Sequence, residues 1–344
     1  MKKVLYLLIA ISLLLIGCAK ANDPLVDTHK MKVIQTYTTI GNPIDIDSHG
    51  NMLFIADDFG GYHIYNSNSG ELIKSANYYM YAGIQSPLQV KIIRYDHLSK
   101  CMILLNRLNS SNWNMEFFSL NDPANPTLLD YSSGDTVDLK SIVLEASADT
   151  SKYDFAIYRT SKSSSKLKYS EVKLGSYPIQ HDIRDVETSY PPEQLGISEE
   201  YVFVCYGQLG VTIFNKNTFD KVASFDTPGY ATAVKYHDGY IYVADRQAGF
   251  HVYKLDTNMN VEHIYTYNTT SGYAENIEIK DNYAALSWNS QGVFLFDISN
   301  PLDIKLADRL PSTVVGYVNN IHFSEHERSL FVASRDKGVL KIEY

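Results

Sequence analysis

Short hydrophobic runs alternate with turn residues along most of this chain, in a pattern that recurs about every 44 residues. Three segments align closely, beginning at Gly229, Gly272 and Gly316, and a looser copy begins at Gly41. Each contains three short apolar runs, with a polar turn after the first and a glycine before the third. Runs this short and evenly spaced are typical of strands in an antiparallel meander.

The residue before the third run marks the repeat along the chain. In five copies it is a glycine: Gly61, Gly210, Gly249, Gly292 and Gly338. In a sixth copy, the segment NMEFFSLNDP, Asn114 takes the same place. A seventh, decayed copy must fill residues 137–187, where the runs DFAIYR and KLKYSEVKL remain strand-like. Seven structural units are therefore predicted.

A fourth apolar run follows the third in the other units, for example KVASFD and EHIYTY, but the last unit stops at Tyr344. The chain also begins with an unmatched run of the same kind, KVIQTYTT from Lys32. If this first run completes the last unit, the sheets close into a ring without an open edge. The sequence thus predicts an all-β, seven-bladed β-propeller of four-stranded antiparallel blades, with the N-terminal strand closing the last blade.

Two of these segments, VADRQAGFHVYKLD and LSWNSQGVFLFDISNP, resemble the LVIVD repeat family, whose members are propellers of secreted and envelope proteins. The resemblance is strong from Gly196 onward and weak between Val137 and Pro192. It implies the propeller fold. It implies little about function, because the family has no single known activity.

The N-terminus predicts where the protein is located. Two lysines, an apolar run from Val4 to Ile16 and a cysteine form a secretory signal that is too short for a membrane span of about 20 residues. The sequence LIGC ending at Cys18 resembles the lipobox of bacterial lipoproteins, which implies cleavage before Cys18 and lipid on that residue; an ordinary cleaved signal is the alternative. We expect a signal peptide (1–17), a lipidated Cys18 with a flexible tether (18–30) and a propeller domain (31–344).

The expected location is therefore the bacterial cell envelope, with the protein held by its lipid anchor. The residue after Cys18 is alanine rather than aspartate. In some Gram-negative lipoproteins this means release to the outer membrane, which we take as the expected site.

Composition narrows the classes of function. The chain is 45% hydrophobic and 20% charged, which excludes a disordered protein. With 30 basic and 39 acidic residues it carries a net charge of −9, so a nucleic acid is not an expected partner. Cys101 and Cys205 lie in apolar runs of non-neighbouring units, so we expect two buried free thiols rather than a disulfide.

Two motifs look like metal sites and fail on inspection. His322, Glu325 and His326 fit the zinc-peptidase pattern H-x-x-E-H, but the segment begins in a predicted strand and ends in a turn, so its imidazoles would not converge. The segment 45–50 begins like a calcium loop but has Ala56 where a bidentate carboxylate is needed. We interpret both segments as strands with their turns.

Catalytic motifs are otherwise absent from the sequence. His63 and His251 occupy equivalent third-strand positions in units far apart along the chain, and we interpret them as packing residues of their sheets. No nucleophile elbow, P-loop, dinucleotide fingerprint or cysteine-rich zinc spacing occurs. We therefore expect that the protein is not an enzyme and needs no cofactor.

The surface of the predicted fold suggests a binding function. In a propeller, the loop before the first strand of a blade (the leading loop) and the turn between its second and third strands (the inner turn) open on one face. Tyr, Trp and Arg held rigidly on such loops are typical of binding hot spots. The candidate partner-binding residues are Asp58, Tyr230, Arg246, Tyr273, Trp288, Asn289, Tyr317 and Arg335. For the three tyrosines an alternative is a packing role between neighbouring blades.

The sequence thus predicts a monomeric, non-enzymatic module that binds a protein or glycan of the envelope and contacts the membrane through its lipid. One alternative is a calcium-assisted hydrolase of the lactonase-like propeller type, because oxygen ligands suit Ca²⁺. Its candidate ligands are Asp45, Glu275, Asn276, Asn319 and Asn320. A second alternative, a scaffold for outer-membrane protein assembly, rests on fold and anchor alone.

Overall fold

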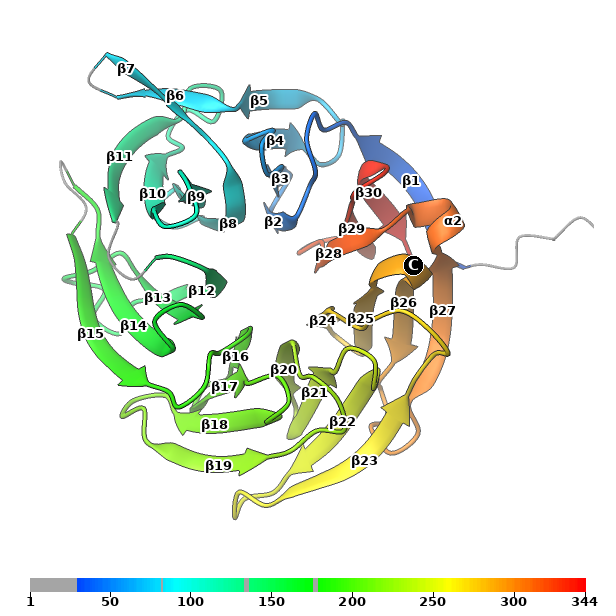
Figure 1. Ribbon diagram of the computed structural model, residues 1–344. Helices are drawn as coiled ribbons and strands as arrows, with labels where there is room; N and C mark the ends of the chain where they lie inside the picture. Colours follow the sequence, from blue (N-terminus) through cyan, green and yellow to red (C-terminus); the bar gives the residue numbers. More distant parts are fainter. Residues whose placement is uncertain (1–29, 82, 133–135, 176–178) are drawn as a thin grey trace, which may run out of the picture. The chain divides into compact units, whose positions relative to one another are not determined.

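Seven four-stranded antiparallel sheets follow one another around a central axis (Figure 1). The computed structural model describes residues 30–81, 83–132, 136–175 and 179–344, and the sheets belong to the compact unit Met31–Tyr344. The prediction of an all-β, seven-bladed propeller is confirmed. The decayed segment forms a complete blade.

Blades 1 to 6 each consist of four consecutive strands, which run from the axis outward. In blade 1 they are β2 (Asp45–His49), β3 (Met52–Ala56), β4 (Tyr62–Asn66) and β5 (Leu72–Ala76); in blade 2, β8 (Val90–Asp96), β9 (Cys101–Arg107), β10 (Trp113–Ser119) and β11 (Thr127–Ser132). In blade 3 they are β12 (Leu139–Ala146), β13 (Phe155–Ser161), β14 (Lys166–Lys173) and β15 (Ile179–Glu187).

The following three blades repeat this order. In blade 4 the strands are β16 (Leu195–Ile197), β17 (Tyr201–Cys205), β18 (Val211–Asn215) and β19 (Lys221–Phe225); in blade 5, β20 (Ala233–His237), β21 (Tyr240–Ala244), β22 (Phe250–Leu255) and β23 (Val261–Tyr267). In blade 6 they are β24 (Asn276–Lys280), β25 (Tyr283–Trp288), β26 (Gly292–Asp297) and β27 (Lys305–Pro311).

Blade 7 closes the ring with strands from both ends of the described domain. Its first three strands are β28 (Val318–Phe323), β29 (Ser329–Ser334) and β30 (Gly338–Glu343), and its fourth is β1 (Lys32–Tyr37). Val33 pairs with Ile342 in antiparallel register, as predicted. The Tyr37 hydroxyl donates a 2.6 Å hydrogen bond to the carbonyl of Ser67, which ties the closing strand to blade 1.

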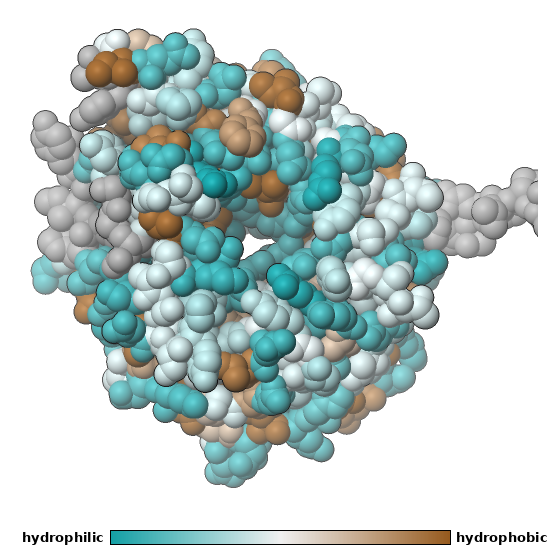
Figure 2. Space-filling view, in the orientation of Figure 1, coloured by the Kyte–Doolittle hydropathy of each residue, from teal (hydrophilic) through white to brown (hydrophobic). Residues whose placement is uncertain are grey.

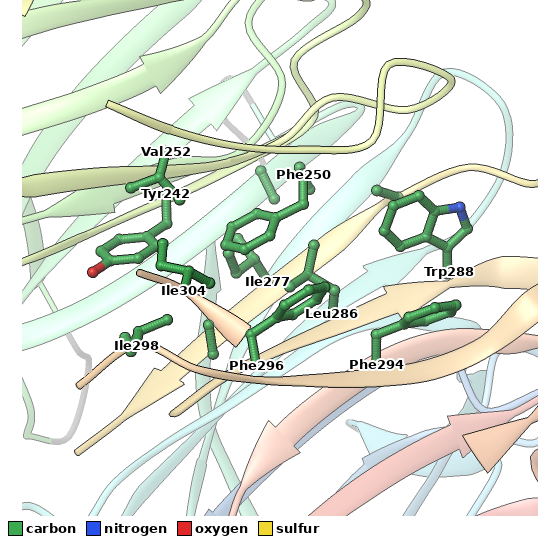
Figure 3. Packing of buried hydrophobic residues seen from close by; sticks show 14 residues of the cluster. Tyr242, Phe250, Val252, Ile277, Leu286, Trp288, Phe294, Phe296, Ile298 and Ile304 are labelled. Carbon is green, nitrogen blue, oxygen red and sulfur yellow. The ribbon is translucent and has the colours of Figure 1, made fainter. Parts of the chain in front are cut away.

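Hydrophobic side chains fill the space between neighbouring blades. The second and third strands are buried on both faces, and their apolar residues form clusters shared by adjacent sheets. Figure 3 shows one such cluster, in which Tyr242 and Phe250 of blade 5 pack near Phe294 and Phe296 of blade 6. Each fully buried Phe stabilises the fold by about 1.5–3 kcal/mol relative to an exposed one.

A few elements stand outside the seven blades. The hairpin of β6 (Tyr78–Tyr81) and β7 (Ile84–Pro87) projects between blades 1 and 2 and was not predicted (Figure 1). The short helices η1 (Asn289–Gln291) and α2 (Ser312–Val315) lie in loops. Within the described residues, no helix has the length and apolar character that a membrane span requires.

The two cysteines of the propeller are buried free thiols, as predicted. Cys101 lies in blade 2 and Cys205 in blade 4, and neither is exposed. Burial raises the pKa of both thiols. Because the thiolate is the reactive form, burial disfavours reaction of both side chains in the folded protein.

Candidate functional site

Leading loops and inner turns meet at one end of the propeller, which we call the loop face. Backbone bridges join Asp58 to Val90 and Arg246 to Ala274. In the second bridge each residue donates to the carbonyl of the other, over 3.0 and 3.2 Å. The inner turn of one blade therefore holds the leading loop of the next, so side chains on this face are rigidly placed.

Three of the predicted partner-binding residues surround one depression of the loop face. Tyr273, Asn289 and Tyr317 line a pocket of about 490 Å³. The Asn289 amide donates a 2.9 Å hydrogen bond to the Tyr317 hydroxyl, and this bond joins blade 6 to blade 7. Tyr273 keeps 47% of its surface exposed. These three residues therefore lie together, and their binding role stays a prediction.

A second depression of about 410 Å³ lies beside the first, and Gln247 lines both. It contains Tyr230 and Arg246, whose guanidinium lies 4.2 Å from the centre of the tyrosine ring. The Tyr230 hydroxyl donates a 2.6 Å hydrogen bond to Glu193 of the preceding blade. Burial raises the pKa of Tyr230, and this bond adds to the rise. We call the two depressions together the tyrosine groove.

The half-buried tyrosines Tyr230 and Tyr317 have the packing role that the sequence left open as an alternative. Arg335 stacks on Tyr317 at 4.1 Å, as Arg246 does on Tyr230, so an arginine covers a tyrosine in two blades; Arg335 is exposed and Arg246 is half-buried. Each such contact is worth about 0.5–1 kcal/mol at an exposed site. The tyrosine rings thus pack between blades while their arginine partners remain accessible.

Trp288 does not belong to this exposed surface, and its expected position there is wrong. Its side chain is completely buried, and its ring packs against Phe294 at a centroid distance of 4.9 Å (Figure 3). The ring of Tyr267 lies 6.0 Å from it. A partner on the loop face would not touch Trp288. The sequence placed Trp288 on the inner turn beside Asn289, but Trp288 is the last residue of β25 and its side chain points into the space between the blades.

Asp58 lies on the loop face but apart from the tyrosine groove. Its carboxylate accepts hydrogen bonds from Lys91 at 2.5 Å and from Gln89 at 2.8 Å, both in blade 2 or its leading loop. Asp58 therefore joins blades 1 and 2. It lines neither depression of the tyrosine groove.

The axis of the propeller is a polar cavity of about 300 Å³, lined by residues from the first strands or leading loops of all seven blades. Figure 2 shows hydrophilic residues around the central opening. Charged groups in it are paired across blades: Arg94 lies 2.5 Å from Asp45, and Lys235 lies 2.9 Å from Glu278. The cavity therefore combines charges of both signs.

The predicted calcium ligands do not converge on one point. Asp45, Asn276 and Asn320 line the axial cavity, whereas Glu275 and Asn319 are outside its lining. Glu275 lies 3.4 Å from the Arg246 guanidinium, and burial raises its pKa. Within the described residues, no group of three or more His, Cys, Asp or Glu side chains is arranged to hold a metal ion.

Asp45 shows why this set suits internal bonding. Its carboxylate accepts hydrogen bonds from the Arg94 guanidinium, the Ile93 amide and the Asn320 side chain. Burial raises the pKa of Asp45, and the Arg94 charge opposes that rise. Carboxylate oxygens with this many donors have few lone pairs left for a cation.

The H-x-x-E-H segment is a strand followed by a turn, as interpreted from the sequence. His322 belongs to β28 and lies 3.7 Å from Asp47 in the axial cavity. The Glu325 carboxylate contacts His326 at 3.3 Å and His49 of blade 1 at 2.9 Å. The two motif histidines therefore contact different carboxylates.

The equivalent histidines His63 and His251 are buried inside their own blades, as the sequence interpretation proposed. His63 lies 2.9 Å from the carboxylate of Asp57, and His251 lies 3.7 Å from that of Asp245. Burial lowers the pKa of His251 to about 4 and raises that of Asp245 to about 6. These pairs pack the sheets.

Comparison with known proteins finds one family model that matches two stretches of this chain. The LVIVD repeat model matches residues 228–252 and 271–309. The chain carries LVIVD repeats. The crystal structure of Ika8, a computationally designed protein, is similar at a TM-score of 0.61 and 10% identity, covering 91% of this chain and 100% of that chain. This likeness shows the fold alone. Comparison with curated proteins finds no match.

In this LVIVD-repeat propeller, the tyrosine groove is built largely by the matched repeats. Tyr230 and Arg246 fall in one matched segment, and Tyr273 and Asn289 in the other. Sequence reasoning missed the exposed side chains Ile40 and Phe59, which are 70% and 73% exposed on the loops of blade 1. Neither recurs in other repeats, so the alignment gave no signal for them.

Proposed function

We propose that this protein is a binding module of the bacterial cell envelope, held by lipid at Cys18, and that its tyrosine groove binds a partner protein. The observation that carries the proposal is the convergence of Tyr273, Asn289 and Tyr317 around one open depression. Tyrosine and arginine bury a large area at low entropic cost, which is why they dominate protein interfaces.

A glycan is the second class of partner for the same groove. Tyrosine rings and amide side chains also suit sugars, but arginines stacked on tyrosines are more typical of protein hot spots. Arg335 is exposed beside the groove and offers a planar donor for a carboxylate of the partner. We therefore favour a partner protein with an acidic side chain at the interface.

The lipid anchor explains how such a module would work. The tether of residues 18–30 has 13 residues, so it spans at most about 45 Å when extended. The propeller would then meet its partner close to the membrane surface, where a restricted volume raises the effective concentration. We place the protein at the outer membrane, as a monomer.

Site-specific photo-crosslinking in the bacterium tests this proposal. We expect a photoreactive residue at Tyr273 to form a covalent adduct with one envelope protein, which mass spectrometry identifies. The same residue at Leu98 is the matched control, because Leu98 is 71% exposed but lies in the turn between β8 and β9, at the opposite end of the blades. Fractionation of the same cells tests the anchor, since Cys18→Ser should move the protein out of the membrane fraction.

Equal adducts from both positions, or none from Tyr273, would contradict the proposal. Arg335→Ala should weaken the specific adduct, because the guanidinium lies at the edge of the groove. Removal of the Arg335 side chain should leave the fold intact, because this side chain is exposed.

A further inference from the structure

Blade 4 lacks a contact that holds the leading loops of blades 1 and 5. In blade 1, the amide of Gly41 donates a 2.6 Å hydrogen bond to the carboxylate of Asp57, the first residue after the second strand. In blade 5, Gly229 donates to Asp245 in the same way over 2.8 Å. A Cβ on either glycine would collide with the aspartate's carbonyl oxygen. The loop is thus held tightly against its blade.

The equivalent residues of blade 4 are both tyrosines. The amide of Glu193 donates to the carbonyl of Cys205 as Thr232 does to Ala244 in blade 5, which fixes the correspondence. Counting from these bonds, Tyr190 takes the place of the loop glycine and Tyr206 that of the aspartate. Neither the close approach nor the carboxylate is available there, so the loop is held differently.

A pocket of about 480 Å³ lies at this point, between the outer strands of blades 3 and 4. Its volume is within the range of small-molecule sites. Its lining contains aromatic, hydroxyl and apolar side chains with one charge of each sign: Val186, Glu187, Thr188, Ser189, Tyr190, Tyr206, Leu209, Thr212, Phe214, Lys221 and Ser224. We call it the blade-4 pocket.

The Tyr206 hydroxyl points to a missing ligand. Tyr206 is only 9% exposed, and its buried oxygen has no hydrogen-bond partner of normal geometry among the described residues. The Thr188 hydroxyl approaches it, but its single proton is directed to the carbonyls of Ser165 and Tyr190, at 2.8 and 2.7 Å, so Thr188 leaves the Tyr206 oxygen without a donor. A buried hydroxyl whose hydrogen-bonding capacity is not fully used is costly and therefore rare in native proteins.

The lining identifies the class of ligand. Tyr190 offers a ring that is 55% exposed, and Ser189, Thr212 and Ser224 add hydroxyl groups around it. An aromatic face edged by hydroxyls matches a sugar, which has apolar C–H faces and a rim of hydroxyls. Glu187 and Lys221 balance each other, so the lining favours no ionic ligand. We propose that the blade-4 pocket binds a neutral saccharide, with Tyr206 hydrogen-bonded to one of its hydroxyls.

This proposal goes beyond the function of the tyrosine groove, because other residues build the pocket. The test uses the full-length chain in detergent and an array of neutral oligosaccharides of hexoses and N-acetylhexosamines. The strongest binder is then titrated by calorimetry against three variants. We expect Tyr206→Phe to weaken binding about three- to tenfold, the worth of one neutral hydrogen bond. Tyr190→Ala should weaken it at least about tenfold, and Tyr273→Ala should leave it unchanged.

Three outcomes would overturn the proposal: no oligosaccharide binds at millimolar concentration, the two pocket variants bind like the wild type, or only Tyr273→Ala abolishes binding. The last would assign the sugar to the tyrosine groove, so the two proposals fail separately. Thermal unfolding gives a further check on Tyr206. The unfolding temperature of Tyr206→Phe should match or exceed that of the wild type, and a fall of several degrees would reveal an internal partner for the hydroxyl.

Discussion

A single side-chain position, at the end of the second strand or directly after it, lies beside the leading loop in blades 1, 4, 5 and 6. It is Asp57 in blade 1, Asp245 in blade 5, Tyr206 in blade 4 and Trp288 in blade 6, and all four are buried. The position is thus buried in all four blades, and the residue type determines whether the leading loop contacts a carboxylate, a tyrosine or an indole. In blade 6 the loop glycine, Gly272, lies against the indole instead of a carboxylate.

The first prediction at this scale concerns Trp288. Trp288→Ala should lower the free energy of unfolding by about 3–5 kcal/mol, because it leaves a cavity beside Phe294 and Tyr267. Trp288→Phe should cost less, since the indole nitrogen has no hydrogen-bond partner among the described residues and the ring packing is partly kept. Urea denaturation of the three proteins measures the difference.

Tyr273→Ala is the matched control for that experiment. Its ring is 47% exposed, so the free energy of unfolding should change by no more than about 0.5 kcal/mol. If Trp288→Ala were as stable as Tyr273→Ala, the indole would not be part of the core.

Among the elements, the β6–β7 hairpin is attached to blade 2 through a buried carboxyl group. The Tyr79 hydroxyl of β6 donates a 3.1 Å hydrogen bond to Glu116 of β10, and Asn106 of β9 donates to the same oxygen over 2.9 Å. Burial raises the pKa of Glu116 to about 7, although both hydrogen bonds oppose the rise. The ionised form is therefore disfavoured in the folded protein.

Stability should consequently fall as the pH rises through the range in which Glu116 ionises. The folded state retains a proton that the unfolded state, with its ordinary pKa of 4.5, has already lost. This contribution is present below about pH 4.5 and disappears as the pH passes about 7. Glu116→Gln should abolish this part of the pH dependence and be more stable than the wild type at pH 8, by about 1–3 kcal/mol.

Chemical denaturation of both proteins at pH 5 and pH 8 provides the measurement. For each protein, the change in the free energy of unfolding between pH 5 and pH 8 is measured. The difference between the wild-type change and the change of the variant reports on Glu116, because the other groups titrate equally in both proteins. Parallel pH profiles would show that Glu116 is already ionised in the fold.

The blades could be predicted from the sequence because each one repeats the same pattern of apolar runs and polar turns. The β6–β7 hairpin occurs once, so the repeat gave no sign of it. The tyrosine groove was predicted in part, since Tyr230, Tyr273 and Tyr317 recur after a glycine. Trp288 was misplaced because its burial depends on packing between blades, which an alignment of the repeat sequences does not measure.

The blade-4 pocket could not have been predicted in the same way. Its loop, with Tyr190, precedes Gly196, where the strong repeat pattern begins. The correspondence of Tyr190 with the loop glycines emerges only from the backbone hydrogen bonds of Glu193. The backbone hydrogen bonds therefore show that Tyr190 stands where other blades have a glycine, a correspondence that the sequence alone did not give.

For the whole molecule, stability depends on a ring that is closed by one strand. β1 contributes the outer edge of blade 7, and the bridges of the loop face connect inner turns to the next leading loops. Removing residues 31–38 would expose the edge of β30, which is an open template for another chain. We expect the shortened protein to unfold at a lower temperature and to associate.

Size-exclusion chromatography checks this expectation, and a synthetic peptide of residues 31–38 provides its control. The peptide should pair with β30 and restore the monomer, because Val33 and Tyr37 recover their partners Ile342 and Val339. A shortened protein that stays monomeric and equally stable would show that blade 7 does not need its fourth strand.

The pairing of Lys32 with Glu343 also means that the two ends of the domain are neighbours. A short peptide linker could join them and make β30 and β1 a hairpin, as β26 and β27 already are in blade 6. The chain could then be cut at another outer connection and still rebuild the same circle. The order of the blades around the axis would stay the same, although the chain would begin at another blade. Circular permutants therefore offer a way to move the anchor to another position on the outer edge of the propeller.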